Sequence, residues 1–310
     1  MNARRAWRGD VVLVVVAAFA FATSGPLGKV ASSIPAATIA ALRTGIAAVV
    51  LFVFAPRAIT ASLVALRPKY RLLVALGGAI LGVHFALFLG GLARTSLAAA
   101  VALVSLEPLS VVLVAFFAFG IRPTRRELFG LVVATGGALV VASGAGSGEH
   151  RLEGDLMVLG AVVLYGAYVA AARGARDALP GRAYITAVYA GATLTLLPFA
   201  LSFGLGESAT TSRSLGAVVA LAFVPTLVGH SLVQLAARRV PPAIVALVSP
   251  GETIGALFIG AWMGAPPSSK EAVGAVVVLV GATIAILARN SDGSSDGGSP
   301  SSQRHPVPRA

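Results

Sequence analysis

Two glutamates stand inside long apolar stretches of this sequence, where an ionisable side chain is uncommon. Glu107 directly precedes Pro108, and Glu252 directly follows a Pro-Gly pair. Ionisable residues within a membrane span by default mark functional pathways, and interrupted helices hold the ligand in many membrane proteins. Both glutamates are therefore candidate binding groups for a substrate or a proton. The alternative is a structural role as buried partners, with Arg43 as the opposite charge.

Arg43 lies in the apolar stretch 36–56, about 11 Å below one end of the helix expected there. The second half of the chain has no counterpart to it, because Val188 stands at the equivalent position. Contact with a substrate and a structural pairing with a carboxylate both remain open for this residue.

Histidine, glutamine and tyrosine side chains also fall inside apolar stretches. His84 and His230 lie in the third stretch of each half, and Gln234 follows His230 by one turn on the same face. Tyr165 and Tyr168 belong to the sixth stretch. We include all five among the candidate groups for binding a substrate or a proton, with hydrogen bonding between helices as the alternative.

Metal and cofactor chemistry is not expected. Neither His84 nor His230 has a second ligand three or four residues away, and the chain has no cysteine. No HExxH or Walker A motif occurs either. We therefore predict no catalytic residue, no metal site, no cofactor and no ATP-driven activity of this chain alone.

The composition indicates a protein embedded in a membrane. Hydrophobic residues make up 57% of the 310 residues and charged residues only 12%, against about 25% charged in a soluble domain. The net charge of +12 is explained by cations in short loops, so nucleic acid is not an expected partner. A span needs about 20 largely apolar residues, and ten stretches qualify: 11–29, 36–56, 71–92, 97–119, 126–143, 155–173, 183–203, 214–236, 242–264 and 270–288.

An internal repeat fixes how these helices are organised. VALVS at 101–105 recurs as VALVS at 245–249, and at the same offset Glu127 matches Glu271. Five helices per half is an odd number, so the second half must enter the membrane the other way up. The predicted fold is an all-α integral membrane protein of ten transmembrane helices, built as two inverted five-helix repeats. Its parts are an N-terminus (1–9), a first repeat (10–143), a flexible linker (144–154), a second repeat (155–288) and a disordered tail (289–310).

Glycines recur at intervals of seven residues in the fifth and tenth predicted helices. They are Gly130 and Gly137 in the first half and Gly274 and Gly281 in the second. Small residues at such spacing let helix backbones approach closely. We assign these four glycines to helix packing.

Two long motifs resemble a known family, the drug/metabolite transporter superfamily in its ten-helix EamA group. The first motif is SLEPLSVVLVAFFAFG followed by RPTRRELFGLVVATGGALVV, at 105–120 and 122–141. Its partner in the second half is LVSPGETIGALFIGAWMG followed by PPSSKEAVGAVVVLVGATIAIL, at 247–264 and 266–287. The sequence departs from the family pattern at Ile121 and Ala265, where relatives usually carry Glu after Gly, so no role of that Glu is carried over.

The resemblance implies a secondary transporter that exports small metabolites, such as amino acids or drug-like compounds, across the bacterial inner membrane by alternating access. An intramembrane enzyme and a non-transporting membrane sensor are the alternatives. The expected partners are a small-molecule substrate and the lipid bilayer. Proton coupling and a homodimer are left open, as are the substrate and the direction of transport.

The distribution of cations predicts that both termini are cytoplasmic. With ten spans, 18 of the 24 Lys and Arg fall in cytoplasmic loops or termini, and Arg43 lies within a helix; the outside loops hold only Lys29, Arg94, Arg151, Arg213 and Lys270. A reporter fused after residue 289 should therefore be active only if it works in the cytoplasm. Activity of a strictly periplasmic reporter at this position would contradict the topology.

Overall fold

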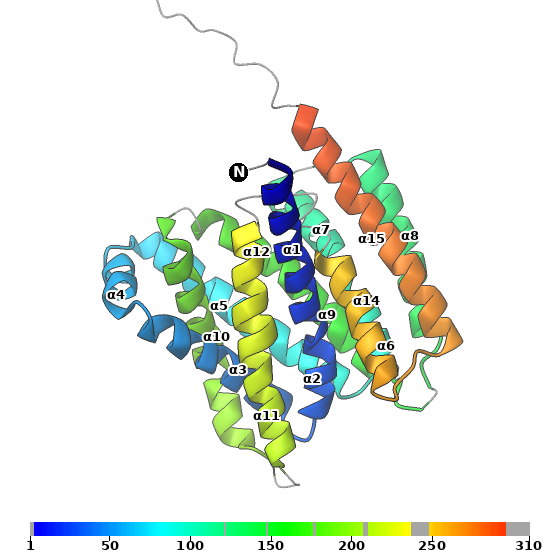
Figure 1. The fold of residues 1–310 in the computed structure, drawn as a ribbon, viewed down its shortest axis with the longest axis horizontal. Helices are drawn as coiled ribbons and strands as arrows, with labels where there is room; N and C mark the ends of the chain where they lie inside the picture. Colours follow the sequence, from blue (N-terminus) through cyan, green and yellow to red (C-terminus); the bar gives the residue numbers. More distant parts are fainter. Residues whose placement is uncertain are drawn as a thin grey trace, which may run out of the picture.

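The described chain is helical throughout. A computed structural model describes residues 3–120, 122–146, 148–175, 178–206, 210–236 and 248–295, and these contain no strand (Figure 1). The first half contains α1 Ala3–Ala22, α2 Ser24–Val30, α3 Ala36–Val53, α4 Pro56–Val64, α5 Pro68–Leu92, α6 Leu97–Val104, α7 Glu107–Phe119 and α8 Arg125–Ala142. The second half contains α9 Leu152–Ala175, α10 Gly181–Phe203, α11 Ser212–Leu221, the π-helix η2 Ala222–Gly229, α12 His230–Ala236, α14 Val248–Trp262 and α15 Ser269–Ser295.

Eight helical segments of the described residues are long and apolar enough to cross a membrane. Two predicted spans, 126–143 and 242–264, are not in this set, because of charge in the first and of the described length of the second. The helix α8 has three charged side chains in its first turn, from Arg125 to Glu127, and α14 is described only from Val248 onward. The chain is thus a multi-pass membrane protein, and the count of ten spans stays a prediction.

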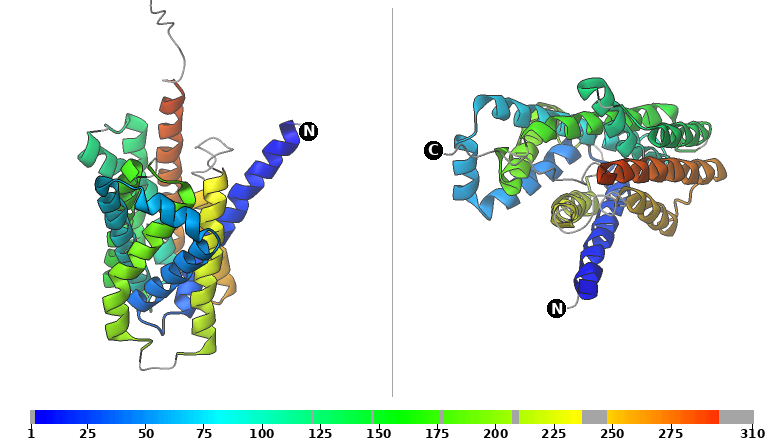
Figure 2. Two further views of the ribbon diagram at one scale, coloured as in Figure 1. Left: turned by 90° about the vertical axis from the view of Figure 1, so that its left-hand side faces the viewer. Right: turned by 90° about the horizontal axis from the view of Figure 1, so that it is seen from above.

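Apolar side chains cover the outside of the helical bundle. Phe117 and Trp262 are 81% and 84% exposed, and leucines, valines and other phenylalanines join them around the surface. A monomer in water rarely exposes so much continuous apolar surface, so this surface fits lipid. Figure 2 shows the N-terminal part of α1 leaning away from the neighbouring helices.

Equivalent helices of the two halves pack against each other in opposite directions. Between α3 and α10, the hydroxyl of Thr38 donates to the carbonyl of Gly204 at 2.7 Å, while Thr44 and Thr193 share a hydroxyl hydrogen bond of 2.9 Å. Residue numbers therefore rise along one helix as they fall along the other. An antiparallel contact between equivalent helices is what an inverted repeat requires.

The same relation joins α8 and α15, which run side by side (Figure 1). A Cβ added to Gly130 would lie 2.6 Å from the carbonyl oxygen of Gly281, and one added to Gly137 would lie 2.9 Å from that of Gly274. Real Cβ atoms essentially never approach backbone atoms closer than about 3.0 Å. Gly130 thus faces Gly281, which corresponds to Gly137 in the repeat, and Gly137 faces Gly274, which corresponds to Gly130. These contacts agree with the predicted packing role.

Breaks in the helices differ in part from the expectation. The interruption beside Glu107 is present: α6 ends at Val104, and α7 begins at Glu107 with Pro108 in its first turn. The predicted interruption beside Glu252 is not found in the described residues, because α14 is helical from Val248 through that position. Pro250 and Gly251 are thus both part of the helix.

Three features depart from the predicted boundaries. The short helix α4 fills a stretch that the sequence leaves as a loop, and the apolar span 214–236 contains the π-helix η2 around Pro225. The helix α15 continues to Ser295, so residues 289–295 of the predicted disordered tail are helical, while 296–310 lie outside the described residues.

Bulk at the α8–α15 contact should prevent folding. Gly137→Leu or Gly281→Leu would force two backbones apart, so we expect a sharp fall in the yield of folded protein, measured by size-exclusion chromatography in detergent. The matched control is Gly136→Leu, because nothing lies within 4 Å of a Cβ placed there. Normal yield with lost transport in the two test variants would instead place these glycines in the transport pathway.

Candidate functional site

Arg43 on α3 is a buried cation, with only 2% of its surface exposed. Its Nε donates to the hydroxyl oxygen of Thr226 at 2.8 Å, and its guanidinium lies 4.1 Å from the centre of the Phe85 ring. Its Nη1 is buried and has no hydrogen-bond partner among the described residues. A buried donor without a partner costs free energy, so Arg43 retains capacity for a further acceptor.

Thr226 belongs to the π-helix, and that local structure presents its hydroxyl to Arg43. Besides accepting from Arg43, the Thr226 hydroxyl donates to the carbonyl of Leu221 at 2.7 Å, five residues back. Pro225 lacks an N–H and cannot continue regular helical bonding. Widened helical turns of this kind occur frequently at functional sites. Sequence reasoning missed Thr226, although a proline within an apolar span marked the place.

His84 and Glu107 face each other across α5 and α7. His84 Nδ1 lies 2.8 Å from the carbonyl oxygen of Ala161 on α9, and a carbonyl only accepts, so this nitrogen carries the hydrogen. The other nitrogen, Nε2, lies 3.9 Å from Glu107 Oε1, which is too long for a hydrogen bond. The Glu107 side chain keeps 15% of its surface accessible. The pair is thus arranged to hold one proton, or a ligand hydrogen, between carboxylate and imidazole.

Glu252 completes the charged group from the second half. Its charge interacts electrostatically with Arg43, Glu107 and Tyr165. Among the described basic residues, only His84 approaches the Glu107 carboxylate, at 3.9 Å, and none forms an ion pair with Glu252. Two carboxylates therefore share the field of one guanidinium, which leaves an acceptor capacity that a proton or a ligand cation can fill.

Aromatic side chains enclose this group. Tyr165 and Tyr168 both belong to α9. The centre of the Tyr165 ring lies 5.7 Å from that of His84 and 6.2 Å from that of Tyr168. His230 packs edge-on against Phe21 at 4.9 Å between ring centres and lies 6.1 Å from Tyr189. Tyr189 also donates to the carbonyl of Thr226 at 3.3 Å.

The structure thus brings most of the predicted residues to one region. Seven of them converge from α3, α5, α7, α9, α12 and α14: Arg43, His84, Glu107, Tyr165, Tyr168, His230 and Glu252. Gln234 lies on α12, but its side chain is outside the described part of the chain. The four packing glycines lie at the separate α8–α15 contact.

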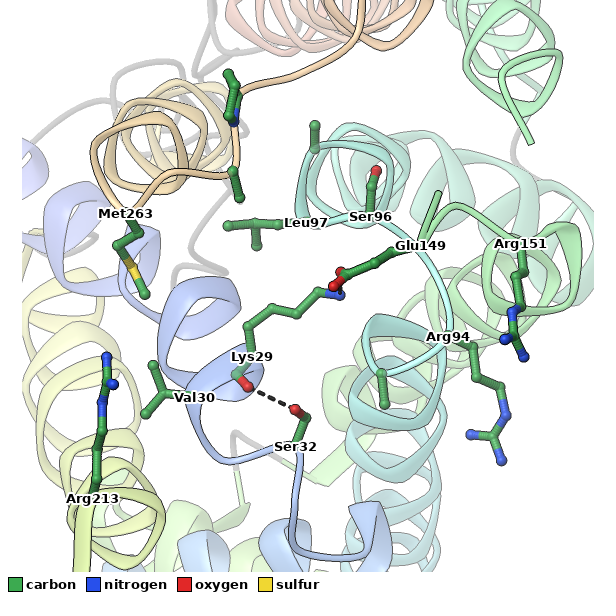
Figure 3. Close-up of a pocket in the computed structure, with 14 residues that line it drawn as sticks. Lys29, Val30, Ser32, Arg94, Ser96, Leu97, Glu149, Arg151, Arg213 and Met263 are labelled. Carbon is green, nitrogen blue, oxygen red and sulfur yellow. Dashed lines mark hydrogen bonds and ion pairs between the residues drawn. The ribbon is translucent and has the colours of Figure 1, made fainter. Parts of the chain in front are cut away.

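A cavity that the sequence did not indicate opens at the end of the bundle where α6 begins. Its volume is about 620 Å³, and its described lining residues include the cations Lys29, Arg94, Arg151 and Arg213 and one acid, Glu149 (Figure 3). Lys29 lies near the end of a helix, a position from which a lysine can extend to the membrane surface. Instead, its Nζ donates to the carbonyl of Thr95 at 2.8 Å and to the carboxylate of Glu149 at 2.9 Å. The hydrogen bond from Lys29 lowers the pKa of the exposed Glu149 carboxyl.

Two inverted helical units, an apolar exterior and a charged group enclosed between the units define a multi-pass membrane protein of the transporter type. The profile of the EamA-like transporter family matches residues 9–143 and 152–287. The chain therefore belongs to the EamA-like transporter family of the drug/metabolite transporter superfamily, as the two sequence motifs indicate.

One solved structure adds support for the fold alone. It carries the description "Crystal structure of protein" and is 21% identical in sequence, with a TM-score of 0.61 over 92% of this chain and 99% of that one. Among curated proteins, no match to this chain is found.

The hydroxyl of Thr226 should matter for stability because it is the partner of a buried guanidinium. Thr226→Val keeps the shape but leaves Arg43 Nε without its acceptor, and we expect a loss of about 1–3 kcal/mol. The measurement is thermal unfolding in detergent. Thr186→Val is the matched control, since that buried hydroxyl only donates to the carbonyl of Arg182 in its own helix. Equal losses in the two variants would contradict the assigned partnership.

Proposed function

We propose that this protein is a secondary transporter that exports a small metabolite across the bacterial inner membrane by alternating access, with both termini in the cytoplasm. The observation that carries the proposal is the convergence of Arg43, His84, Glu107 and Glu252 from both halves of an inverted repeat. In inverted-repeat transporters the substrate lies between the repeats near mid-membrane, and rocking of the repeats changes the side to which it is open.

The charges of the group support a substrate that carries both an acidic and a basic function, as amino acids do. Nη1 of Arg43, which has no hydrogen-bond partner among the described residues, can donate to a carboxylate. Glu107 and Glu252 are acceptors for an amine or for protons, and the tyrosine rings beside them offer apolar surface. A zwitterion would therefore meet both signs of charge within one site.

The His84–Glu107 pair supports coupling to protons. Its 3.9 Å separation and the hydrogen bond of Nδ1 to Ala161 leave Nε2 directed toward the carboxylate. A substrate amine and a proton would compete for the same carboxylate of Glu107 or Glu252. The substrate would then leave the cell as a proton enters it. Membership of a transporter family favours this function over an intramembrane enzyme or a sensor.

Removal of either carboxylate charge should impair transport. Glu107→Gln and Glu252→Gln retain hydrogen bonding, so we expect folded protein with flux reduced at least about tenfold, which corresponds to about 1.4 kcal/mol. The measurement is flux in proteoliposomes at equal amounts of folded protein and at several pH values, with Arg43→Lys as a milder variant.

Glu127→Gln serves as the control for these two substitutions. Glu127 is also a buried glutamate, but its carboxylate caps α8 through the backbone N–H of Thr124. Wild-type flux and an unchanged pH profile in both Gln variants of the site would reduce Glu107 and Glu252 to structural groups.

The substrate and the direction of transport can be determined together. Cells with and without the protein would be grown in parallel, and small molecules in the spent medium would be compared by untargeted mass spectrometry. Export predicts a compound that accumulates outside only in cells with the protein, and to a lesser extent with Glu107→Gln. A compound that is depleted from the medium instead would indicate import.

A further inference from the structure

A second group of titratable residues is buried at the end of the bundle where α6, α9 and α15 begin. His150, in the linker, is 2% exposed, and Asp155 on α9 and Glu271 on α15 are 1% and 4% exposed. His150 Nε2 lies 2.7 Å from Asp155 Oδ2, and His150 Nδ1 lies 3.2 Å from Glu271 Oε1. The sequence predicts a flexible linker here, so the burial of His150 corrects that expectation.

The carboxylates of this His150 cluster already have their other hydrogen-bond donors. The Thr95 hydroxyl donates to Asp155 Oδ1 at 2.7 Å. Ser96 donates its hydroxyl to Glu271 Oε1, and the Ser268 N–H donates to Glu271 Oε2 at 2.7 Å. Every donor in this set is a hydroxyl or an amide that stays uncharged, so the only group that can supply the two carboxylates with a positive charge from within the cluster is His150.

The placement of a carboxylate at each ring nitrogen determines how many protons the cluster needs. A neutral imidazole carries one N–H and one lone pair. One nitrogen of a neutral His150 would then direct its lone pair at a carboxylate oxygen, and such a repulsive contact between buried groups is costly. Nδ1 forms no hydrogen bond within the described residues despite its 3.2 Å distance from Glu271, so an attractive contact at this nitrogen requires a proton on it.

We propose that His150, Asp155 and Glu271 form a second proton-binding site, separate from the Arg43–Glu107–Glu252 group, whose occupancy holds the linker and the first turns of α9 and α15 packed together beside the cavity. This packed arrangement is the closed form of this end of the bundle. With the proton bound, the imidazolium donates toward both carboxylates and links the linker, α9 and α15 to the α5–α6 loop. With the proton lost, one of the two links becomes repulsive. The cluster therefore stabilises the closed end at low pH and releases it as the pH rises.

A proton fits this site better than a metal ion. The two carboxylates lie at opposite nitrogens of one ring, so they cannot coordinate a single ion together with that ring. The described residues contain no arrangement of three such side chains suited to a metal.

The charged neighbours do not supply an alternative partner for His150. Lys29 is bonded to Glu149 and to the carbonyl of Thr95, and Arg94 pairs with Glu153 at 3.2 Å. Lys270 donates to the carbonyl of Ser143 at 3.0 Å. Arg151 and Arg213 are exposed and line the adjacent cavity (Figure 3). The cations next to the cavity thus leave the buried cluster dependent on its own proton.

The consequence for function rests on the proposed transport cycle. Ser96 is both a hydrogen-bond partner of Glu271 and part of the cavity lining, so release of the cluster would move the wall of that cavity. In the predicted topology this end faces outward. Acid outside the cell would then favour the closed end, and neutral or alkaline conditions would favour opening toward the outside.

The test uses the absence of cysteine from the chain. Ala275→Cys places a thiol one turn beyond Glu271, at a position that is 1% exposed, and Ala285→Cys places one further along the same helix at 2%. The full-length protein in detergent, without substrate, is labelled with a maleimide at about pH 5.5 and at about pH 8.5. The ratio of the two labelling rates at each pH removes the increase in rate that both thiols share as more thiolate forms.

We expect the Ala275-to-Ala285 labelling ratio to rise at least about threefold from the lower to the higher pH, as the local opening is populated. Adding Glu271→Gln should remove the rise and keep the ratio low, because the amide donates to a neutral imidazole and still caps α15. Asp155→Asn should act in the same way. His150→Gln should also remove the pH dependence, but with a high ratio at both values.

Glu127→Gln is the matched control, since it changes the equivalent capping residue of α8 and should leave the rise intact. A flat ratio in the otherwise unaltered chain, or a rise that persists in both Glu271→Gln and Asp155→Asn, would overturn the proposal. Because no substrate is present, these outcomes are independent of whether the protein transports. Loss of flux in Glu107→Gln with an intact labelling response would separate the two sites.

Discussion

A guanidinium in the middle of an apolar helix bundle must find its partners within the protein, and much of this structure follows from that requirement. Arg43 cannot reach water from a position that is 2% exposed. Its partners come from different helices: the hydroxyl of Thr226 on the π-helix, the ring of Phe85 on α5 and the charge of Glu252 on α14. Each of these elements is held in place, in part, by the cost of leaving the charge unpartnered.

The symmetry of the fold and the asymmetry of the site have different physical origins. Backbone contacts repeat faithfully, because Gly130 meets Gly281 as Gly137 meets Gly274, and any added side chain would clash in either pair. The charged residues do not repeat: Arg43 corresponds to Val188, and Glu107 corresponds to a glycine. A symmetric framework lets two halves exchange roles during opening and closing, while a single asymmetric set of charges between them can bind one molecule in one orientation.

Sequence reasoning succeeded where the signal is a property of one segment. The repeat, the apolar spans and the glycine spacing each follow from composition and period, and the proline after Glu107 marks a real interruption. It failed where the outcome depends on how segments meet. Pro225 is visible in the sequence, but the widened turns that aim Thr226 at Arg43 are a matter of packing. Glu252 follows a Pro-Gly pair, yet the described part of α14 is helical through all three residues.

The His150 cluster shows the same limit in a sharper form. Its three titratable members belong to the linker and to the first turns of two helices from the second half, more than 100 residues apart in sequence at their extremes, and two donors come from the first half. Locally, Glu271 is a helix cap and His150 a polar loop residue. Only their meeting in a buried space converts ordinary capping groups into a site that needs a proton. A helix cap that also joins the two halves of the molecule responds to pH in a way that an exposed cap does not, because its alternative hydrogen-bond partner, water, has been excluded.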